Sequence, residues 1–292
     1  MRTRILAAIC STLLFASSID AQSDYQRGIN KWRAEHQAEL LAEDGWLTVA
    51  GLFWLKDGVN TVGAGSGFDV ELTDNFKQGK FGEITYSHGS ATLDVFPGVD
   101  AKSDGKSVSR IELVSDEKSK PIKIETGSQT FYLIKREDRF GIRLKDAKNP
   151  ARTNFVGLKW FPINAKFQVT AAFEPFAETQ EVNIPNVLGG TFKMKSPGIL
   201  RFKLGGKEYT LQPVVEDDHL FIIFRDLTSK TSTYGAGRFL YADAPKDGKV
   251  MLDFNKAENP PCAFTSFATC PLPPQQNRLE VAIKAGEKRY YK

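Results

Sequence analysis

After Gly45, the chain is a succession of short apolar or alternating runs separated by Gly, Asp and Pro, and this pattern constrains the fold more than any other feature. Alternation with a period of two puts the apolar side chains of a strand on one face of a sheet. Turn residues between such runs are typical of antiparallel pairing rather than of strand–helix–strand units. At a spacing of roughly 8 to 12 residues, so many runs favour a sandwich or barrel. We therefore expect a mostly-β protein with antiparallel sandwich or barrel-like sheets.

Neighbouring runs flank turn sequences and so predict β-hairpins, with Asp57-Gly58 among the stronger short-range signals. The expected pairs are 52–55 with 59–62, 81–86 with 91–95, 131–135 with 140–144, 211–215 with 220–224, and 238–242 with 250–254 around Asp247-Gly248. Further strands are expected at 166–173, 191–195, 199–204 and 279–283.

Residues 22–48 precede the β-rich part and predict one N-terminal amphipathic helix. Apolar residues recur in it at roughly helical spacing: Ile29, Trp32, Leu40 and Leu41. The β-rich domain then takes in residues 49–292. A soft subdivision falls near 150–162, but no shift in composition marks it, so one continuous domain is an equally defensible interpretation.

The first residues have the organisation of a secretory signal peptide. Met1-Arg2-Thr3-Arg4 is positively charged, residues 5–15 are apolar, and small residues lead to Ala21. The apolar stretch is shorter than the about 20 residues that span a bilayer, which argues against an N-terminal membrane anchor. We expect cleavage after Ala21, a periplasmic or secreted location, and no membrane span in the mature chain.

The charge pattern bears on the class of partner. The chain has 39 Lys and Arg against 35 Asp and Glu, a net charge of +4, and the two signs are well mixed along it. Binding to nucleic acid needs a basic patch rather than scattered charge. We therefore expect no nucleic-acid partner, and no motif predicts a cofactor.

The histidines give little support to a metal site. His36 is expected on the polar side of the N-terminal helix and His88 in an exposed turn. His219 follows Glu216-Asp217-Asp218 and could join these carboxylates around a metal. The same residues make a good hairpin turn, and no paired His or Cys spacing supports a metal, so we expect none.

Cys262 and Cys270 remain once the predicted leader, which contains Cys10, is removed. An even pair in an oxidising compartment predicts one disulfide. Prolines on both sides force extended and turn conformations, so we expect an ordered loop that wraps the surface or covers a cleft. Cys262 is also a candidate nucleophile, which would need a nearby base.

The sequence from Thr233 onward is more specific than strand-forming sequence in general. Its clearest part is Asn259-Pro260-Pro261-Cys262-Ala263-Phe264-Thr265 followed by Ala268-Thr269-Cys270-Pro271-Leu272-Pro273-Pro274. Further distinctive stretches are 45–47, 51–55, 138–143, 185–186, 197–198, 233–241, 252–255, 277–279 and 285–288. With these residues the chain resembles, over nearly all of its predicted mature length, the prokaryotic family catalogued as domain of unknown function 1684 (DUF1684).

The resemblance implies no activity, cofactor or catalytic residue. Family members without an export signal keep both cysteines. In a reducing compartment such a pair would be free thiols, a metal contact or a redox pair, which are the alternatives to a disulfide here.

Four arginines in or near the family-like segments are candidate ligand-binding residues: Arg143, Arg152, Arg238 and Arg278. Arginine holds carboxylate and phosphate groups bidentately, and the backbone of Gly235-Ala236-Gly237 could present N–H groups to an anion. Asp253 and Asn255 complete the set. We interpret the chain as binding a small anionic or polar ligand in an Arg-lined cleft. Alternatively, these arginines form structural salt bridges with Asp146, Asp226 and Asp253.

Two other functions stay open. The chain could be a hydrolase-type enzyme that uses Asp253 or Cys262, although it has no Gly-x-Ser-x-Gly nucleophile elbow. It could also be an envelope structural or interaction protein without a small-molecule site. A binding protein requires the arginines to meet in one pocket, and an enzyme also requires a carboxylate or thiol that faces a base there.

Overall fold

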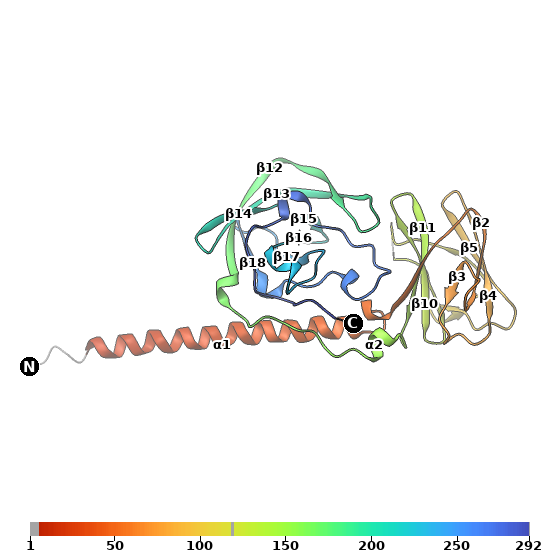
Figure 1. Ribbon diagram of the computed structural model, residues 1–292, viewed down its shortest axis with the longest axis horizontal. Helices are drawn as coiled ribbons and strands as arrows, with labels where there is room; N and C mark the ends of the chain where they lie inside the picture. The colour runs from red at the N-terminus through yellow and green to blue at the C-terminus, as the bar shows by residue number, and fades with distance from the viewer. Residues whose placement is uncertain (1–5, 118–119, 292) are drawn as a thin grey trace, which may run out of the picture.

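The computed structural model describes the backbone of residues 6–117 and 120–291 and, within these ranges, the side chains from residue 23 onward except that of Lys230. The expected mostly-β fold with one N-terminal helix is confirmed (Figure 1). A β-sandwich from the first half of the chain lies beside a second β-rich body. Helix α1 (Leu6–Leu41) runs along that second body toward the sandwich.

The N-terminal sandwich has two sheets that enclose one apolar core. One sheet has the order β1 (Val49–Trp54), β11 (Arg139–Asp146), β10 (Gln129–Arg136), β9 (Lys123–Thr126), β6 (Lys102–Ser103) and β7 (Lys106–Ser107). The other has the order β3 (Val70–Leu72), β2 (Gly58–Ala64), β4 (Lys80–Ser87), β5 (Ser90–Val95) and β8 (Arg110–Leu113). Alternate residues of both sheets point inward, and Phe81 and Phe131 meet edge-on with ring centroids 5.4 Å apart.

The second body also encloses a core between two sheets. Its larger sheet has the order β14 (Lys207–Leu211), β13 (Thr191–Leu204), β12 (Gln168–Pro185) and β18 (Lys249–Asp253). Its smaller sheet has the order β15 (Val214–Glu216), β16 (His219–Phe224) and β17 (Arg238–Ala242). Phe202, Phe224 and Phe254 meet at the centre of this core.

Residues 147–166 carry the chain from the sandwich to the second body. They form the short helix α2 (Pro150–Thr153) and an extended segment that follows α1 (Figure 1). The Arg33 guanidinium donates to the carbonyl of Phe161 at 3.0 Å, and Gln37 Oε1 accepts from the Leu158 N–H at 3.1 Å. The possible domain subdivision that we expected near residues 150–162 falls in this segment.

The N-terminal helix departs from the expected 22–48. It ends at Leu41, the chain turns through Gly45, and residues 46–48 form the 3₁₀ turn η1 (Trp46–Thr48). Residues 1–5 of the predicted signal peptide lie outside the described residues, and residues 6–21 belong to α1. No helix in the described ranges has the length and apolar character needed to cross a membrane.

The hairpins β4–β5, β10–β11 and β15–β16 are confirmed. Two expected hairpins are wrong. β1 pairs with β11 and β2 with β4, because the chain crosses from one sheet of the sandwich to the other at Asp57-Gly58. Likewise β17 pairs with β16 and β18 with β12, so the two arms around Asp247-Gly248 enter different sheets.

Candidate functional site

The smaller sheet of the second body presents a different set of side chains on each face. Leu220, Ile222 and Phe224 of β16 enter the core. Phe221 lies between them in sequence and therefore points to the opposite face, where it packs edge-on against Phe239 of β17 with ring centroids 4.8 Å apart. This second face is the floor of the candidate site.

A cavity of about 370 Å³ lies over that face, between the second body, α1 and the sandwich, and we name it the junction cavity. Its walls come from α1, η1, the end of β10, the tip of the β12–β13 hairpin and residues 258–271. Much of the lining is apolar: Leu40, Trp46, Phe192, Met194, Phe221, Phe239 and Phe264. A mostly apolar cavity of this size with a few polar groups is typical of small-molecule sites.

One arginine of the sandwich lines the basic side of the junction cavity, and a second lies against the same wall through Thr269. Arg136, at the end of β10, lines the cavity and donates from Nε to the Thr269 hydroxyl at 3.0 Å. It also pairs with Asp116 at 2.8 Å. Arg143 of β11 approaches the same Thr269 hydroxyl at 3.4 Å. Two guanidinium groups therefore converge on one hydroxyl in the cavity wall.

Arg143 is a buried cation without an acidic partner. Only 3% of the residue is exposed, and its guanidinium carbon lies 5.3 Å from the centre of the Trp46 ring. Its Nε has no hydrogen-bond partner among the described residues, and none of their carboxylates lies within ion-pair distance of it. Burial and the nearby Arg136 lower the pKa of Arg143, while the Tyr132 hydroxyl and the more distant Asp116 oppose this effect. A buried charge is costly unless it is paired.

Carboxylates and one imidazole form the acidic side of the cavity. His36 Nδ1 lies 3.3 Å from Glu258 Oε2, and its Nε2 lies 3.5 Å from Glu287 Oε2. Glu216, which also lines the cavity, accepts a hydrogen bond from the Tyr241 hydroxyl at 2.8 Å. Burial, reinforced by other glutamates but opposed by His36, raises the pKa of Glu258 to about 7. Burial would lower the pKa of His36, but Glu287 and Glu258 outweigh it and raise that pKa.

The basic and acidic groups occupy different parts of the wall. Glu258, His36 and Tyr241 also line an adjoining depression of about 600 Å³, which Arg136 and Thr269 do not reach. The sandwich supplies the basic groups, whereas α1 and the second body supply the acidic side.

Cys270 lines the cavity and Cys262 lies in the adjoining turn, but the two do not form the disulfide that we expected. Both are free thiols, and the Cys262 N–H donates to Cys270 Sγ at 3.2 Å. The 3₁₀ turn η5 (Pro261–Ala263) and the hydrogen bond from Tyr234 Oη to the Cys262 carbonyl, at 3.0 Å, order this loop without a covalent link.

The two thiols affect each other's pKa. The contact with Cys270 lowers the pKa of Cys262, and the contact with Cys262, together with burial, raises the pKa of Cys270. Among the described residues, Cys270 and the Tyr234 hydroxyl act on the Cys262 thiol, and no imidazole does.

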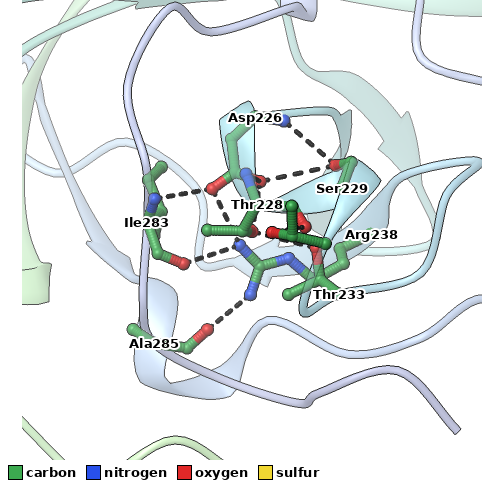
Figure 2. A network of polar contacts seen from close by, with 8 residues as sticks. Asp226, Thr228, Ser229, Thr233, Arg238, Ile283 and Ala285 are labelled. Carbon is green, nitrogen blue, oxygen red and sulfur yellow. Dashed lines mark hydrogen bonds and ion pairs between the residues drawn. The ribbon is translucent and has the colours of Figure 1, made fainter.

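Arg238 lies in the interior of the second body, not in a cleft. Figure 2 shows its guanidinium among the groups that surround Asp226. It lies 3.3 Å from Asp226 Oδ2 and donates to the carbonyls of Ile283, at 3.0 Å, and Ala285. Asp226 also accepts from the Ile283 N–H at 2.6 Å and caps the turn η3 (Leu227–Lys230). This network ties the C-terminal segment to the smaller sheet. Arg238 Nε has no partner among the described residues, but the residue is only 1% exposed and does not line the junction cavity.

The other predicted residues also lie away from the junction cavity. Arg152 donates to the carbonyls of Leu41 and Ala147, both at 2.7 Å, and so joins the end of α1 to α2. Arg278 is exposed in a shallow depression on another part of the second body. Asp253 accepts from the Tyr25 hydroxyl at 2.9 Å, and Asn255 Nδ2 donates to that hydroxyl at 2.9 Å, which fixes α1 to the body.

The four arginines therefore do not share one cleft. Of the salt bridges in the alternative interpretation, Arg238–Asp226 is present. Asp146 instead accepts from Thr73 at 2.5 Å and Asn75 at 2.7 Å, because it closes a loop of the sandwich. Of the predicted ligand-binding residues, Arg143 alone adjoins the junction cavity, through its contacts with Thr269 and Trp46.

The segment before His219 is a hairpin turn. Glu216 pairs with His219 across it, and Asp217 takes a positive φ of 50°. Within the described residues, no group of His, Cys, Asp and Glu has an arrangement that could hold a metal ion.

Sequence reasoning missed Arg136, Glu258 and His36. The signal for His36 was present, because it lies one helical turn from Trp32 and Leu40 and so shares their apolar face. In the structure the His36 ring stacks on the Trp32 ring, with an interplanar angle of 9°. Nothing local distinguishes Glu258 or Arg136, whose roles depend on contacts between distant parts of the chain.

Comparison with known proteins is consistent with the resemblance seen in the sequence. A family model described as Protein of unknown function (DUF1684) matches residues 153–288. A solved structure, the solution NMR structure of an uncharacterized protein from Haloarcula marismortui, is 31% identical and covers 47% of this chain and 78% of its own, with a TM-score of 0.40. No curated protein matches the chain. The matched region contains Glu216, Glu258 and Cys270 of the cavity, whereas Arg136 and Arg143 lie before it.

Proposed function

The chain belongs to the family described as Protein of unknown function (DUF1684), and we propose that this member binds a small ligand with an anionic group in its junction cavity. The observation that carries the proposal is Arg143, of which only 3% is exposed. The described residues supply it with a ring and hydroxyls but with no carboxylate at ion-pair distance, since Asp116, which acts on it electrostatically, is paired with Arg136. A carboxylate or phosphate at Thr269 would provide the missing negative charge.

The surroundings of Arg143 favour such a ligand. Arg136 and Arg143 both approach the Thr269 hydroxyl, so an anion at this wall would meet two guanidinium groups. Hydrogen bonds between ionised partners are stronger than neutral ones, and arginine suits the planar geometry of a carboxylate. The apolar lining from Trp46, Phe221 and Phe264 would take the rest of the ligand.

A thermal-shift experiment tests the proposal. Butanoate, hexanoate and octanoate are compared with the alcohols of the same chain length. We expect the carboxylates to raise the melting temperature more than the alcohols do, because only the carboxylates bring a negative charge to Arg143. A ligand at about 100 times its Kd stabilises the folded state by about 2.7 kcal/mol.

Two variants locate the effect. In Arg143→Met the stabilisation by carboxylates should be lost, whereas Arg278→Met, which alters an exposed arginine outside the cavity, should keep it. Equal stabilisation of wild type and Arg143→Met would remove Arg143 from any binding site.

We also propose that the protein is exported, to the periplasm or the medium, with cleavage after Ala21. The pattern of the first residues supports this. Tyr25, Arg33 and His36, whose side chains join α1 to the second body or to residues 147–166, all follow Ala21, so cleavage would leave these contacts intact. Terminal sequencing of protein from a bacterial envelope fraction should begin at Gln22. Full-length protein confined to the cytoplasm would contradict export.

A further inference from the structure

The acidic side of the junction cavity carries more negative than positive charge. The His36 imidazole lies between Glu258 and Glu287, and Glu39 and Glu216 also act electrostatically on Glu258. Arg238 also acts on Glu287 from the interior, but where Glu258 is ionised the four carboxylates still outnumber Arg238 and a fully protonated His36. This side therefore favours a positive ligand group just as the Arg143 side favours a negative one.

An unpartnered acceptor in the same wall provides a second, independent observation. Asn259 lines the cavity and is 97% buried. Its Nδ2 donates to Glu287 Oε1 at 2.5 Å and to the Lys288 carbonyl at 2.8 Å, which fixes the orientation of the amide. Its Oδ1 has no donor among the described residues. A buried acceptor without a donor costs free energy, so a donor group on a ligand would relieve it.

From this charge separation we infer that the ligand is a zwitterion, with an anionic group at Arg143 and Arg136 and an ammonium group at Glu258 and Asn259. An apolar segment between the two groups lies on Phe221 and Phe239. This inference rests on the proposed function and adds the second recognition group. A primary ammonium has three donors and no acceptor, which matches a wall of carboxylates and an amide oxygen.

Calorimetric titration with three matched probes tests the inference. Hexanoate carries only the anionic group, hexylamine only the cationic group, and ω-aminohexanoate both. The four-carbon and eight-carbon analogues of each probe cover shorter and longer distances between the two ends of the cavity. The titrations are made at about pH 8, where carboxylates with a pKa near 7 are mostly ionised. We expect an ω-amino acid of fitting length to bind at least about tenfold more tightly than its parent carboxylate, the gain of one charge-assisted hydrogen bond.

Glu258→Gln should abolish this tenfold advantage while leaving the affinity for the plain carboxylate unchanged. The matched control Glu280→Gln, which changes an exposed glutamate outside the cavity, should keep the advantage. If Glu258→Gln proves unstable, Glu216→Gln serves as a second variant, with an intermediate loss of the advantage expected.

The possible failures are distinguishable. If every ω-amino acid binds no better than its parent carboxylate, and Arg143→Met still abolishes carboxylate binding, the zwitterion is wrong and the proposed function stands. If neither class of probe binds wild type, both are wrong. If the advantage persists in Glu258→Gln and in Glu216→Gln, the ammonium is not recognised at this wall and the inference fails.

Discussion

Nδ1 of His36, on α1, lies 3.3 Å from Oε2 of Glu258, which follows the last strand of the second body. Burial raises the pKa of Glu258 to about 7, from 4.5. The pKa of His36 is also raised, because Glu287 and Glu258 outweigh burial. The folded protein therefore keeps protons on both groups at pH values where the unfolded chain has released them.

The first prediction concerns stability against pH. Where the folded state binds more protons than the unfolded state, the free energy of unfolding falls as pH rises. For Glu258 this holds between about 4.5 and 7, and for His36 above 6.5. We expect stability in urea to fall by up to about 3 kcal/mol from pH 5 to pH 8 through these groups. Glu258→Gln should reduce the slope and Glu280→Gln should not; a slope unchanged in Glu258→Gln would contradict the assignment.

The second prediction is that Arg143→Met makes the ligand-free protein no less stable. A buried guanidinium without a carboxylate partner is costly, and a methionine of similar length avoids that cost. We expect a gain of about 1 kcal/mol in urea denaturation, together with the loss of carboxylate binding. A clear loss of stability in Arg143→Met would show that its contacts with Thr269 and Trp46 are structural.

The third prediction concerns Asp226 and Arg238, a fully buried pair 3.3 Å apart. Asp226→Asn would leave the guanidinium without its counter-charge and weaken the cap of η3. Removing one partner of a buried pair costs about 3 to 5 kcal/mol, so the urea midpoint should fall sharply. Glu174→Gln, which disrupts the exposed pair with Arg201, is the matched control and should leave the midpoint nearly unchanged. Similar effects of both changes would refute a structural role for the buried pair.

The fourth prediction concerns the thiols. Protein purified without reductant should show two free thiols, and iodoacetamide should modify Cys262 before Cys270, because Cys262 is more exposed and has the lower pKa. Its reaction in Cys270→Ser should shift to higher pH, since the contact that lowers its pKa is weakened. Absence of free thiols in the unreduced protein would restore the disulfide.

The sequence predicted the β-class and several hairpins because these depend on local periodicity and turn residues. The Asp247-Gly248 turn shows what a local sequence pattern can and cannot predict. Lys246 and Lys249 do pair across this turn, with mutual N–H to carbonyl bonds of 2.9 and 3.0 Å. The arms then separate, because β17 and β18 find partners in different sheets. Turn chemistry predicts the bend, whereas pairing further along depends on distant strands.

The long β12–β13 hairpin illustrates the same limit. Its outer part was not expected, since Pro175, Pro185 and a run of polar residues interrupt the strand pattern. The structure accommodates them with a break in register between Pro175 and Gln180. The tip of this hairpin contributes Phe192 and Met194 to the junction cavity.

For the site, the sequence identified candidate residue types but not the residues that they contact in the fold. Arginine as an anion ligand was a sound physical idea, yet Arg238 meets Asp226 inside a core while Arg143 meets no carboxylate among the described residues. Which of these arises is decided by sheet register and by the docking of α1 and residues 258–271. None of these contacts is encoded within a short stretch of chain.

The Arg143 side chain gives the most direct test of the account, because its Nε carries an N–H without a partner in the described structure. In a ¹H–¹⁵N spectrum this resonance is assigned by its disappearance in Arg143→Met. On titration with hexanoate we predict that it shifts and saturates together with the heat of binding, while the Arg278 resonance stays in place. A stationary Arg143 resonance at saturating hexanoate would contradict an anion site at the junction cavity.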